Sequence, residues 1–281
     1  AIPSAGFFIG LFFVPESPRW LVETGKEEEA FQVLERVEAE TSRAALEEIR
    51  QTVAEESGRM RDLIAPGLRK ATLIALSLAV LQQITGINTI LFYGSIIFKE
   101  HVGGQTESAS IGANVVVGLM NFAATWVALG LIDKVGRVKL LIVSAAVMAL
   151  AHWSMGLCFL ADKPNPLAVL ASMLLCVASF AIGLGPGVWV VMSEIFPTKI
   201  RGRAMSLATV ALWAACVALT MTFLTLSRWL TPSGAFWLYA GICVGTSLFV
   251  KQMVPETKGK TLEEIEKFWK PAAAEPVARR R

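Results

Sequence analysis

Charged residues are scarce in this 281-residue sequence, since Asp, Glu, Lys and Arg make up 17% of it and hydrophobic residues 54%. Six stretches contain no Asp, Glu, Lys or Arg, and each exceeds the roughly 20 residues that cross a bilayer as a helix. These stretches are 71–98, 108–132, 140–161, 164–193, 204–227 and 229–250. The sequence therefore predicts an all-α membrane protein with a bundle of six transmembrane helices, residues 69–254.

Catalytic and metal-binding patterns are lacking as well. The four cysteines lie inside predicted spans without CxxC spacing, which indicates neither a disulfide framework nor a zinc site, so we interpret them as packing residues. They are Cys158, Cys176, Cys216 and Cys243. No stretch combines a nucleophile, a general base and oxyanion donors, which disfavours an enzyme, and no cofactor or metal site is indicated.

Residues 1–14 are apolar but too short for a full span, covering about 21 Å of a core about 30 Å thick. They lack Met, a basic flank and a cleavage site, so we interpret them as the end of a truncated span rather than a signal peptide. Basic residues gather in the loops after the second, fourth and sixth full spans. The positive-inside rule then places the segment 15–68 and the C-terminus in the cytoplasm.

The segment 15–68 reads as a cytoplasmic helical linker without a site of its own. Thr24 and Glu27 form a capping box that predicts a helix start, and Ser42 can cap a second helix. The expected apolar stripes are Phe31, Leu34 and Val37 on the first helix, and Leu46, Ile49 and Val53 on the second. Thr261 with Glu264 predicts a further helix in the C-terminal region 255–281, followed by a tail.

The first full span contains an unusual run of polar side chains: Gln82, Gln83, Asn88 and Tyr93. Hydrocarbon offers an amide no hydrogen-bond partner, so these groups must face protein, water or a polar solute. Gly86 lies among them and weakens the helix locally, and discontinuous spans are where transporters commonly expose binding groups. The alternative is that the two glutamines join helices together.

Other spans add single candidates. Asn121 lies near mid-bilayer, where it can either reach the same cavity as Gln82 or join two helices. His152 can relay protons, but no acidic residue shares its span, so a packing role is favoured. Pro186, among glycines, predicts a kinked fourth span, and Trp189 below it offers either a flat face for a sugar ring or ordinary packing. Trp213 lies in the fifth span.

Carboxylates and arginines recur at the cytoplasmic helix ends. Asp133 and Arg137 are four residues apart, and Glu194 and Arg201 are seven apart across Pro197. Such pairs can hold one arrangement of spans closed and separate in another. The prediction is a gating network rather than a binding site.

Five motifs give the sequence a family resemblance. They are PESPRWL (15–21), QQITGIN (82–88), DKVGR (133–137), SEIFP with IRGRA (193–204) and PETKGKTLEEIE (255–266). In this order and spacing the chain resembles the C-terminal half of the sugar porter family of the major facilitator superfamily. PESPR and PETKG each follow a span, which is typical of a repeat boundary.

The resemblance implies a sugar transporter that works by alternating access, with spans seven to twelve in this chain. Sugar-binding residues by resemblance are Gln82, Gln83, Asn88, Asn121, Trp189 and Trp213, with Tyr93 as an outer gate. The implied gating network is Glu16, Arg19, Asp133, Arg137, Glu194 and Arg201. The implied partners are a sugar, the lipid bilayer and a missing N-terminal six-span half, and no nucleic acid. Whether protons are also a partner stays open, because in this family the coupling of sugar transport to protons depends on an acidic residue in the first span, which lies outside this sequence.

Two positions depart from the family pattern. Many members have a glutamate where Ala181 stands and an amide where Leu212 stands, so two polar contacts to the sugar are lost. The expected substrate is therefore a hexose, a pentose or a polyol. Two alternatives stay open, namely a sugar sensor that does not transport and a fragment that is inactive on its own.

Overall fold

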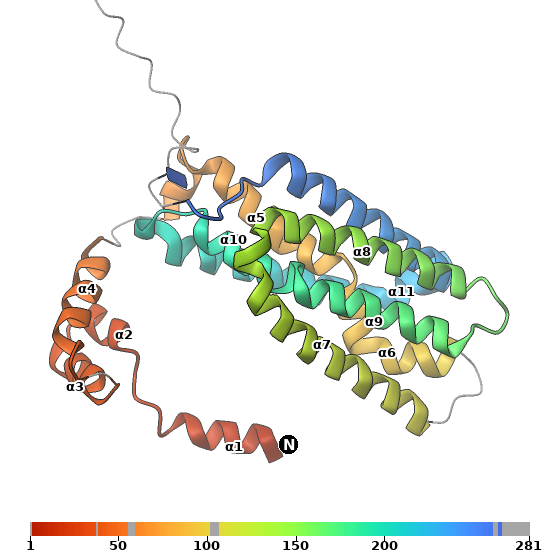
Figure 1. The fold of residues 1–281 in the computed structure, drawn as a ribbon, viewed down its shortest axis with the longest axis horizontal. Coiled ribbons are helices and arrows are strands. Elements are labelled where there is room, and N and C mark those ends of the chain that lie inside the picture. The colour runs from red at the N-terminus through yellow and green to blue at the C-terminus, as the bar shows by residue number, and fades with distance from the viewer. Residues whose placement is uncertain (1, 38, 56–59, 102–106, 261–263, 266–281) are drawn as a thin grey trace, which may run out of the picture. The chain divides into compact units, whose positions relative to one another are not determined.

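The computed structural model describes residues 2–37, 39–55, 60–101, 107–260 and 264–265. The chain forms two compact units, Ala1–Asp62 with Thr198–Gly202 and Leu63–Pro197 with Arg203–Arg281. Every regular element in the described ranges is a helix (Figure 1). The helix predicted after Thr261 falls almost wholly outside these ranges.

The first unit contains α1 (Ile2–Leu11), α2 (Pro18–Glu23), α3 (Glu27–Val37) and α4 (Ser42–Glu55). Ser17 begins α2, because its hydroxyl oxygen accepts a hydrogen bond from Trp20 N at 3.3 Å and Pro18 occupies the first helical position. A small apolar core joins α2, α3 and α4. Its members are Leu21, Val22, Ala30, Val33, Leu46, Ile49 and Val53.

Two local predictions for this unit are wrong. Thr24 does not cap α3; it ends α2, and its hydroxyl donates to Trp20 O at 2.9 Å. The apolar stripe of α3 is also displaced, since Ala30 and Val33 join the core while Val37 is 80% exposed. The stripe predicted for α4 is confirmed. In a short charged helix several faces are about equally apolar, and the element that packs against the helix determines which face is buried.

The second unit is a bundle of long apolar helices. They are α5 (Arg69–Ile84), α6 (Ile87–His101), α7 (Glu107–Val135), α8 (Arg137–Cys158), α9 (Pro166–Ile182), α10 (Leu184–Glu194) and α11 (Thr198–Met253) from Arg203 onward. A short 3₁₀ turn, Met60–Ile64, contains the point in the chain where the first unit ends and the second begins. Among the described residues, five continuous or nearly continuous helices are long and apolar enough to cross a membrane. The six predicted apolar stretches fall on these helices apart from one to three residues at an end of four of them, and the 56-residue α11 contains two of the six.

The two passes of α11 meet at Thr231, whose backbone is not helical (φ 62°, ψ 162°). Pro232 follows directly, and the Thr231 hydroxyl oxygen accepts a weak hydrogen bond from Gly234 N at 3.4 Å. Thr231 therefore acts as an N-cap for residues 232–253. Figure 1 shows the chain turning back here, so that the second pass returns along the bundle near α8.

Two passes are broken near their middle. The first breaks between α5 and α6 at Thr85–Gly86, where Gly86 adopts φ +86°. This confirms the predicted discontinuity. The other break, between α9 and α10, lies at Gly183 rather than at Pro186, which is tolerated in the first turn of α10. The hydroxyl of Ser144 stabilises this break, because it accepts from Leu184 N at 3.0 Å and donates to Ser179 O at 2.7 Å.

Candidate functional site

The break between α5 and α6 brings three amide side chains into one hydrogen-bonded chain. Asn88 Nδ2 donates to Gln83 Oε1 at 2.5 Å, and Gln83 Nε2 donates to Gln82 Oε1 at 3.1 Å. Gln82 Nε2 in turn donates to the backbone oxygens of Leu184 and Gly185 in α10, at 2.8 and 2.9 Å. The amide chain therefore connects the two broken passes.

The three amides differ in how much of their bonding capacity is already used. Gln82 is 2% exposed, and both ends of its amide are bonded, so it joins α5 to α10. Gln83 is 7% exposed, and one of its two amide hydrogens is used within the chain. Asn88 is half-buried, and among the described residues none donates to its Oδ1. Gln83 and Asn88 therefore retain donor and acceptor capacity for a polar ligand.

The first pass of α11 contacts the same wall. Cys216 Sγ lies 3.2 Å from Asn88 Nδ2, and Tyr93 donates its hydroxyl hydrogen to Thr220 O at 2.9 Å. Tyr93 also packs on Phe223, with ring centroids 5.1 Å apart. Cys216 was missed as a neighbour of the amides, because a lone apolar-span cysteine carries no local signal for a contact 128 positions away. Its packing role is consistent with its 6% exposure.

Trp213, Trp189 and Asn121 present partly open faces. Trp213 is 58% exposed, three residues before Cys216, and lines an open cavity of about 620 Å³ with Thr209 and Val217. Trp189 is 36% exposed on α10, and Asn121 is half-buried on α7. In the described ranges, no side-chain hydrogen bond joins these three residues to the amide chain.

The two residues that depart from the family pattern are both buried. Ala181 is 3% exposed and Leu212 is 2% exposed. His152 is fully buried too; its Nε2 lies 3.5 Å from Cys176 Sγ, and its ring stacks on Phe236 with centroids 5.9 Å apart. These contacts agree with a packing role for His152.

A second polar cluster gathers where α7 ends and α8 begins. Arg137 Nη2 lies 3.0 Å from both Asp133 Oδ1 and Glu194 Oε1, so one guanidinium links α7, α8 and α10. The Arg137 side chain is 14% exposed and that of Glu194 is 27% exposed, whereas that of Asp133 is 74% exposed. The Arg137–Glu194 contact is therefore the better-shielded half of this charged network.

The segment after α11 supplies two members of the network that the sequence reasoning missed. Glu256 accepts hydrogen bonds from Arg137 N and Val138 N, both at 3.1 Å, and so caps the N-terminus of α8 with a carboxylate. The Thr257 hydroxyl donates to Glu194 Oε2 at 2.5 Å. The signal is present in the sequence, because both residues belong to the PETKG motif, which indicates the family and a repeat boundary but does not by itself assign them to the network.

Three predicted members of the network, Glu16, Arg19 and Arg201, belong to the first compact unit. Their part in gating stays a prediction.

Removing the Glu256 carboxylate should destabilise the N-terminus of α8. We expect Glu256→Ala to lower stability by roughly 1–2 kcal/mol, because two backbone N–H groups lose their acceptor and the helix loses a favourable negative charge. The stability of Glu256→Gln, which keeps an acceptor oxygen but no charge, should lie between those of the wild type and Glu256→Ala. Thermal unfolding in detergent measures the effect; identical midpoints for all three proteins would contradict the capping role.

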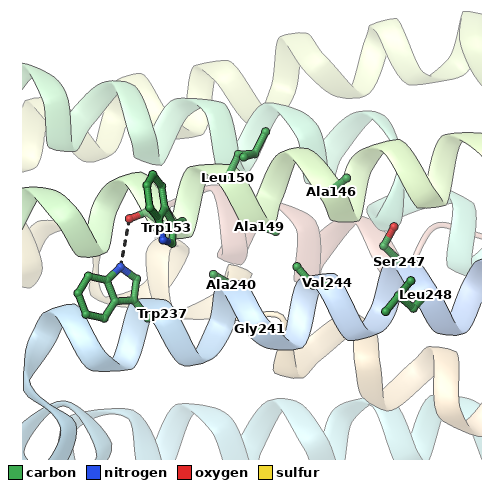
Figure 2. Close-up of a pocket in the computed structure, with 10 residues that line it drawn as sticks. All are labelled: Ala146, Ala149, Leu150, Trp153, Trp237, Ala240, Gly241, Val244, Ser247 and Leu248. Atoms are coloured by element: carbon green, nitrogen blue, oxygen red, sulfur yellow. Dashed lines mark hydrogen bonds between the residues drawn. The ribbon is translucent and has the colours of Figure 1, made fainter.

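A cavity of about 530 Å³ lies between α8 and the second pass of α11. Its lining residues are Ala146, Ala149, Leu150, Trp153, Trp237, Ala240, Gly241, Val244, Ser247 and Leu248 (Figure 2). Two polar groups here already have partners, since Trp237 Nε1 donates to Trp153 O and the Ser247 hydroxyl to Ile142 O, each at 3.3 Å. None of the predicted site residues lines this apolar cavity, which therefore does not suit a polyhydroxyl ligand.

Comparison with known proteins gives one family match across nearly the whole chain. The model of the family described as "Sugar (and other) transporter" matches residues 1–269. The arabinose-proton symporter of Bacillus subtilis is 39% identical over 270 residues, which cover 95% of this chain and 58% of that protein. The D-xylose-proton symporter of Escherichia coli K12 is 37% identical over 279 residues, covering 96% and 56%.

Solved structures agree with these relatives. The proton:xylose symporter XylE bound to 6-bromo-6-deoxy-D-glucose superposes with a TM-score of 0.75 at 35% identity, covering 96% of this chain and 57% of that one. The inward-open xylose transporter XylE from E. coli gives 0.77 at 34% identity, covering 96% and 55%. The chain thus spans a little over half the length of the relatives it matches.

Proposed function

Because this chain belongs to the sugar transporter family, we propose that it supplies the C-terminal half of a membrane transporter that moves a neutral sugar by alternating access. The observation that carries the proposal is the amide chain at the break between α5 and α6. Amides pair with hydroxyl groups as both donors and acceptors, and they do so without placing a charge in the membrane. The site therefore suits a polyhydroxyl solute that has shed its water.

Within this site we assign different roles to the three amides. Asn88 Oδ1 accepts from a sugar hydroxyl, and the second amide hydrogen of Gln83 donates to one. Gln82 is already bonded at both ends, so it supports the wall by holding α5 against α10. Asn121, Trp189 and Trp213 complete the site, the two indole rings as flat surfaces for the apolar face of the sugar ring.

In this proposal residues 1–14 end span six, 15–68 form the linker and 69–254 contain spans seven to twelve. The terminal helix and tail predicted for 255–281 lie almost wholly outside the described residues. The linker and the C-terminus lie in the cytoplasm of a cell-membrane protein, as the basic loops indicate. The N-terminal six-span half faces the amide chain and closes the cavity.

In this arrangement Tyr93 gates the site from outside, and its bond to Thr220 O supports this role. The charged network of Asp133, Arg137 and Glu194 gates the cytoplasmic end, together with Glu16, Arg19 and Arg201. Glu256 and Thr257 extend the network to the segment after α11. Closing the network holds the cytoplasmic ends together, and breaking it lets them separate.

The substrate is a hexose, a pentose or a polyol. Relatives support the pentose and polyol parts of this range, since they include symporters of arabinose and xylose and a myo-inositol transporter of Bacillus subtilis. The trehalose carriers among them are facilitated transporters, so coupled and uncoupled modes both occur in the family. Uptake measured with and without a pH gradient decides between a proton symporter and a facilitator.

Truncating either Gln83 or Asn88, the two amides with unused bonding capacity, should weaken sugar transport. We expect Gln83→Ala and Asn88→Ala each to raise the half-saturating sugar concentration roughly 10-fold, the change associated with losing one or two hydrogen bonds to hydroxyls. The measurement is uptake of labelled xylose, arabinose, myo-inositol and trehalose into proteoliposomes that contain this chain and its N-terminal half.

The matched control is Gln105→Ala, an amide that lies outside the charge-free spans. Unchanged uptake and binding in both site variants would show that the site assignment is wrong. Wild-type uptake of trehalose alone would exclude the monosaccharide and polyol classes.

A further inference from the structure

The second pass of α11 presents two different faces. Its outer face lines the apolar cavity of Figure 2 through Trp237, Gly241 and Val244. Its inner face contains Tyr239, 1% exposed, and Cys243, fully buried. This inner face lies directly behind the break between α5 and α6, on residues to which neither the sequence motifs nor the proposed site gives a role.

The ring of Tyr239 occupies the space that a side chain at Gly86 would need. A Cβ built on Gly86 would lie 2.6 Å from Tyr239 Cγ and 2.7 Å from Cδ2. Such close approach of a ring to the backbone is possible only at glycine. The Tyr239 hydroxyl oxygen also accepts a hydrogen bond from Thr89 Oγ1 at 3.2 Å, so one side chain contacts both the break and the first turn of α6.

Cys243 contacts the other side of the break. In a continuous helix Thr89 N would donate to Thr85 O, but here it donates to Gly86 O at 3.1 Å. The Thr85 carbonyl is then available to Cys243 Sγ, which lies 3.6 Å away and acts as a weak donor. Tyr239 and Cys243 therefore bond to the two sides of the same discontinuity.

We propose that Tyr239 and Cys243 form a brace that sets the direction of α6 relative to α5 and thereby positions Asn88 against Gln83. Asn88 precedes Thr89 in the first turn of α6, so the bond that locates Thr89 also locates the Asn88 amide. Both brace residues are positioning residues on the second pass of α11, which contributes no residue to the proposed sugar site. The inference rests on the proposed sugar site.

Tyr239→Phe tests the brace with little risk to folding, because the ring stays on Gly86 and only the bond to Thr89 is lost. We expect about a 3- to 10-fold weaker equilibrium binding of the sugar that the wild type transports, with the maximal uptake rate nearly unchanged. Thr89→Val should give the same loss, and the double variant no more than either single one.

Two further experiments distinguish a positioning role of Tyr239 from a general contribution to stability. In an Asn88→Ala background, Tyr239→Phe should not weaken sugar binding further, because the positioned group is gone. Hydrogen exchange of the amides at the start of α6 should be faster in Tyr239→Phe than in wild type, and this arm needs no sugar. Cys243→Ala should also speed exchange, whereas its exposed neighbour Val244→Ala should not.

Unchanged binding and exchange in Tyr239→Phe would overturn the brace, as would an equal loss of binding in the Asn88→Ala background. A wild type that binds none of the four sugars would overturn the proposed function, and the exchange arm would still decide whether Tyr239 fixes α6.

Discussion

Gly86→Ala is expected to abolish sugar uptake and to destabilise the bundle by ~2–5 kcal/mol. Two costs add: an L-residue at φ +86° pays about 1–2 kcal/mol, and the new methyl group overlaps the Tyr239 ring at an overpacking cost of about 1–3 kcal/mol. The overlap cannot be relieved by a small shift, because Tyr239 is 1% exposed and bonded to Thr89. The break that shapes the site would have to move.

Gly241→Ala is the matched control for this variant. Gly241 lies in the second pass of α11, and a Cβ there meets no heavy atom within 4 Å. The same substitution should therefore leave uptake and the unfolding midpoint close to wild type. Thermal unfolding in detergent and uptake into proteoliposomes measure both variants. Wild-type behaviour of Gly86→Ala would mean that the helix break has another cause.

Arg137→Ala should have the second largest effect, with a loss of roughly 2–3 kcal/mol for the closed arrangement of the charged network. The variant leaves Glu194, whose side chain is 27% exposed, without its cationic partner. Asp133 is 74% exposed and returns to water, so it contributes little. Arg137→Lys should not restore function, because Nη2 contacts both carboxylates while Nη1 donates to Ile132 O at 3.4 Å, and one ammonium group cannot occupy both positions.

The expected signature of Arg137→Ala is a lower maximal uptake rate with sugar binding nearly unchanged, since the network lies at the helix ends and not at the amides. Lys139→Ala is the control, because it removes the same charge from an exposed position in the first turn of α8. If the two variants reduced the rate equally, the effect would come from net charge and the network would have no gating role.

Much of the bundle could be predicted from the sequence, because a long stretch without charged residues in a membrane protein is explained by a helix that crosses the bilayer. The site amides were found for the same reason: polar groups such as Gln83 and Asn88 are costly in hydrocarbon and attract notice without any partner being known. The break at Gly86 was also predictable, because glycine weakens helices in any context.

What escaped prediction depends on contacts between distant parts of the chain. Glu256 caps a helix that begins 119 residues earlier, and Cys216 meets an amide 128 residues earlier. Neither side chain looks unusual beside its own sequence neighbours. The prediction that Thr24 caps α3 failed for the opposite reason. Its local pattern fits the end of one helix as well as the start of the next, and only the folded backbone distinguishes the two.

The turn at Thr231 restricts how the two passes of α11 can move against each other. With a single non-helical residue between them, the adjoining ends stay within one or two Cα–Cα steps of about 3.8 Å. The two passes can therefore move against each other mainly by rotation about Thr231, and their relative displacement grows with distance from this residue. An insertion of flexible residues at Thr231 would remove the hinge and would also allow the two passes to slide past each other.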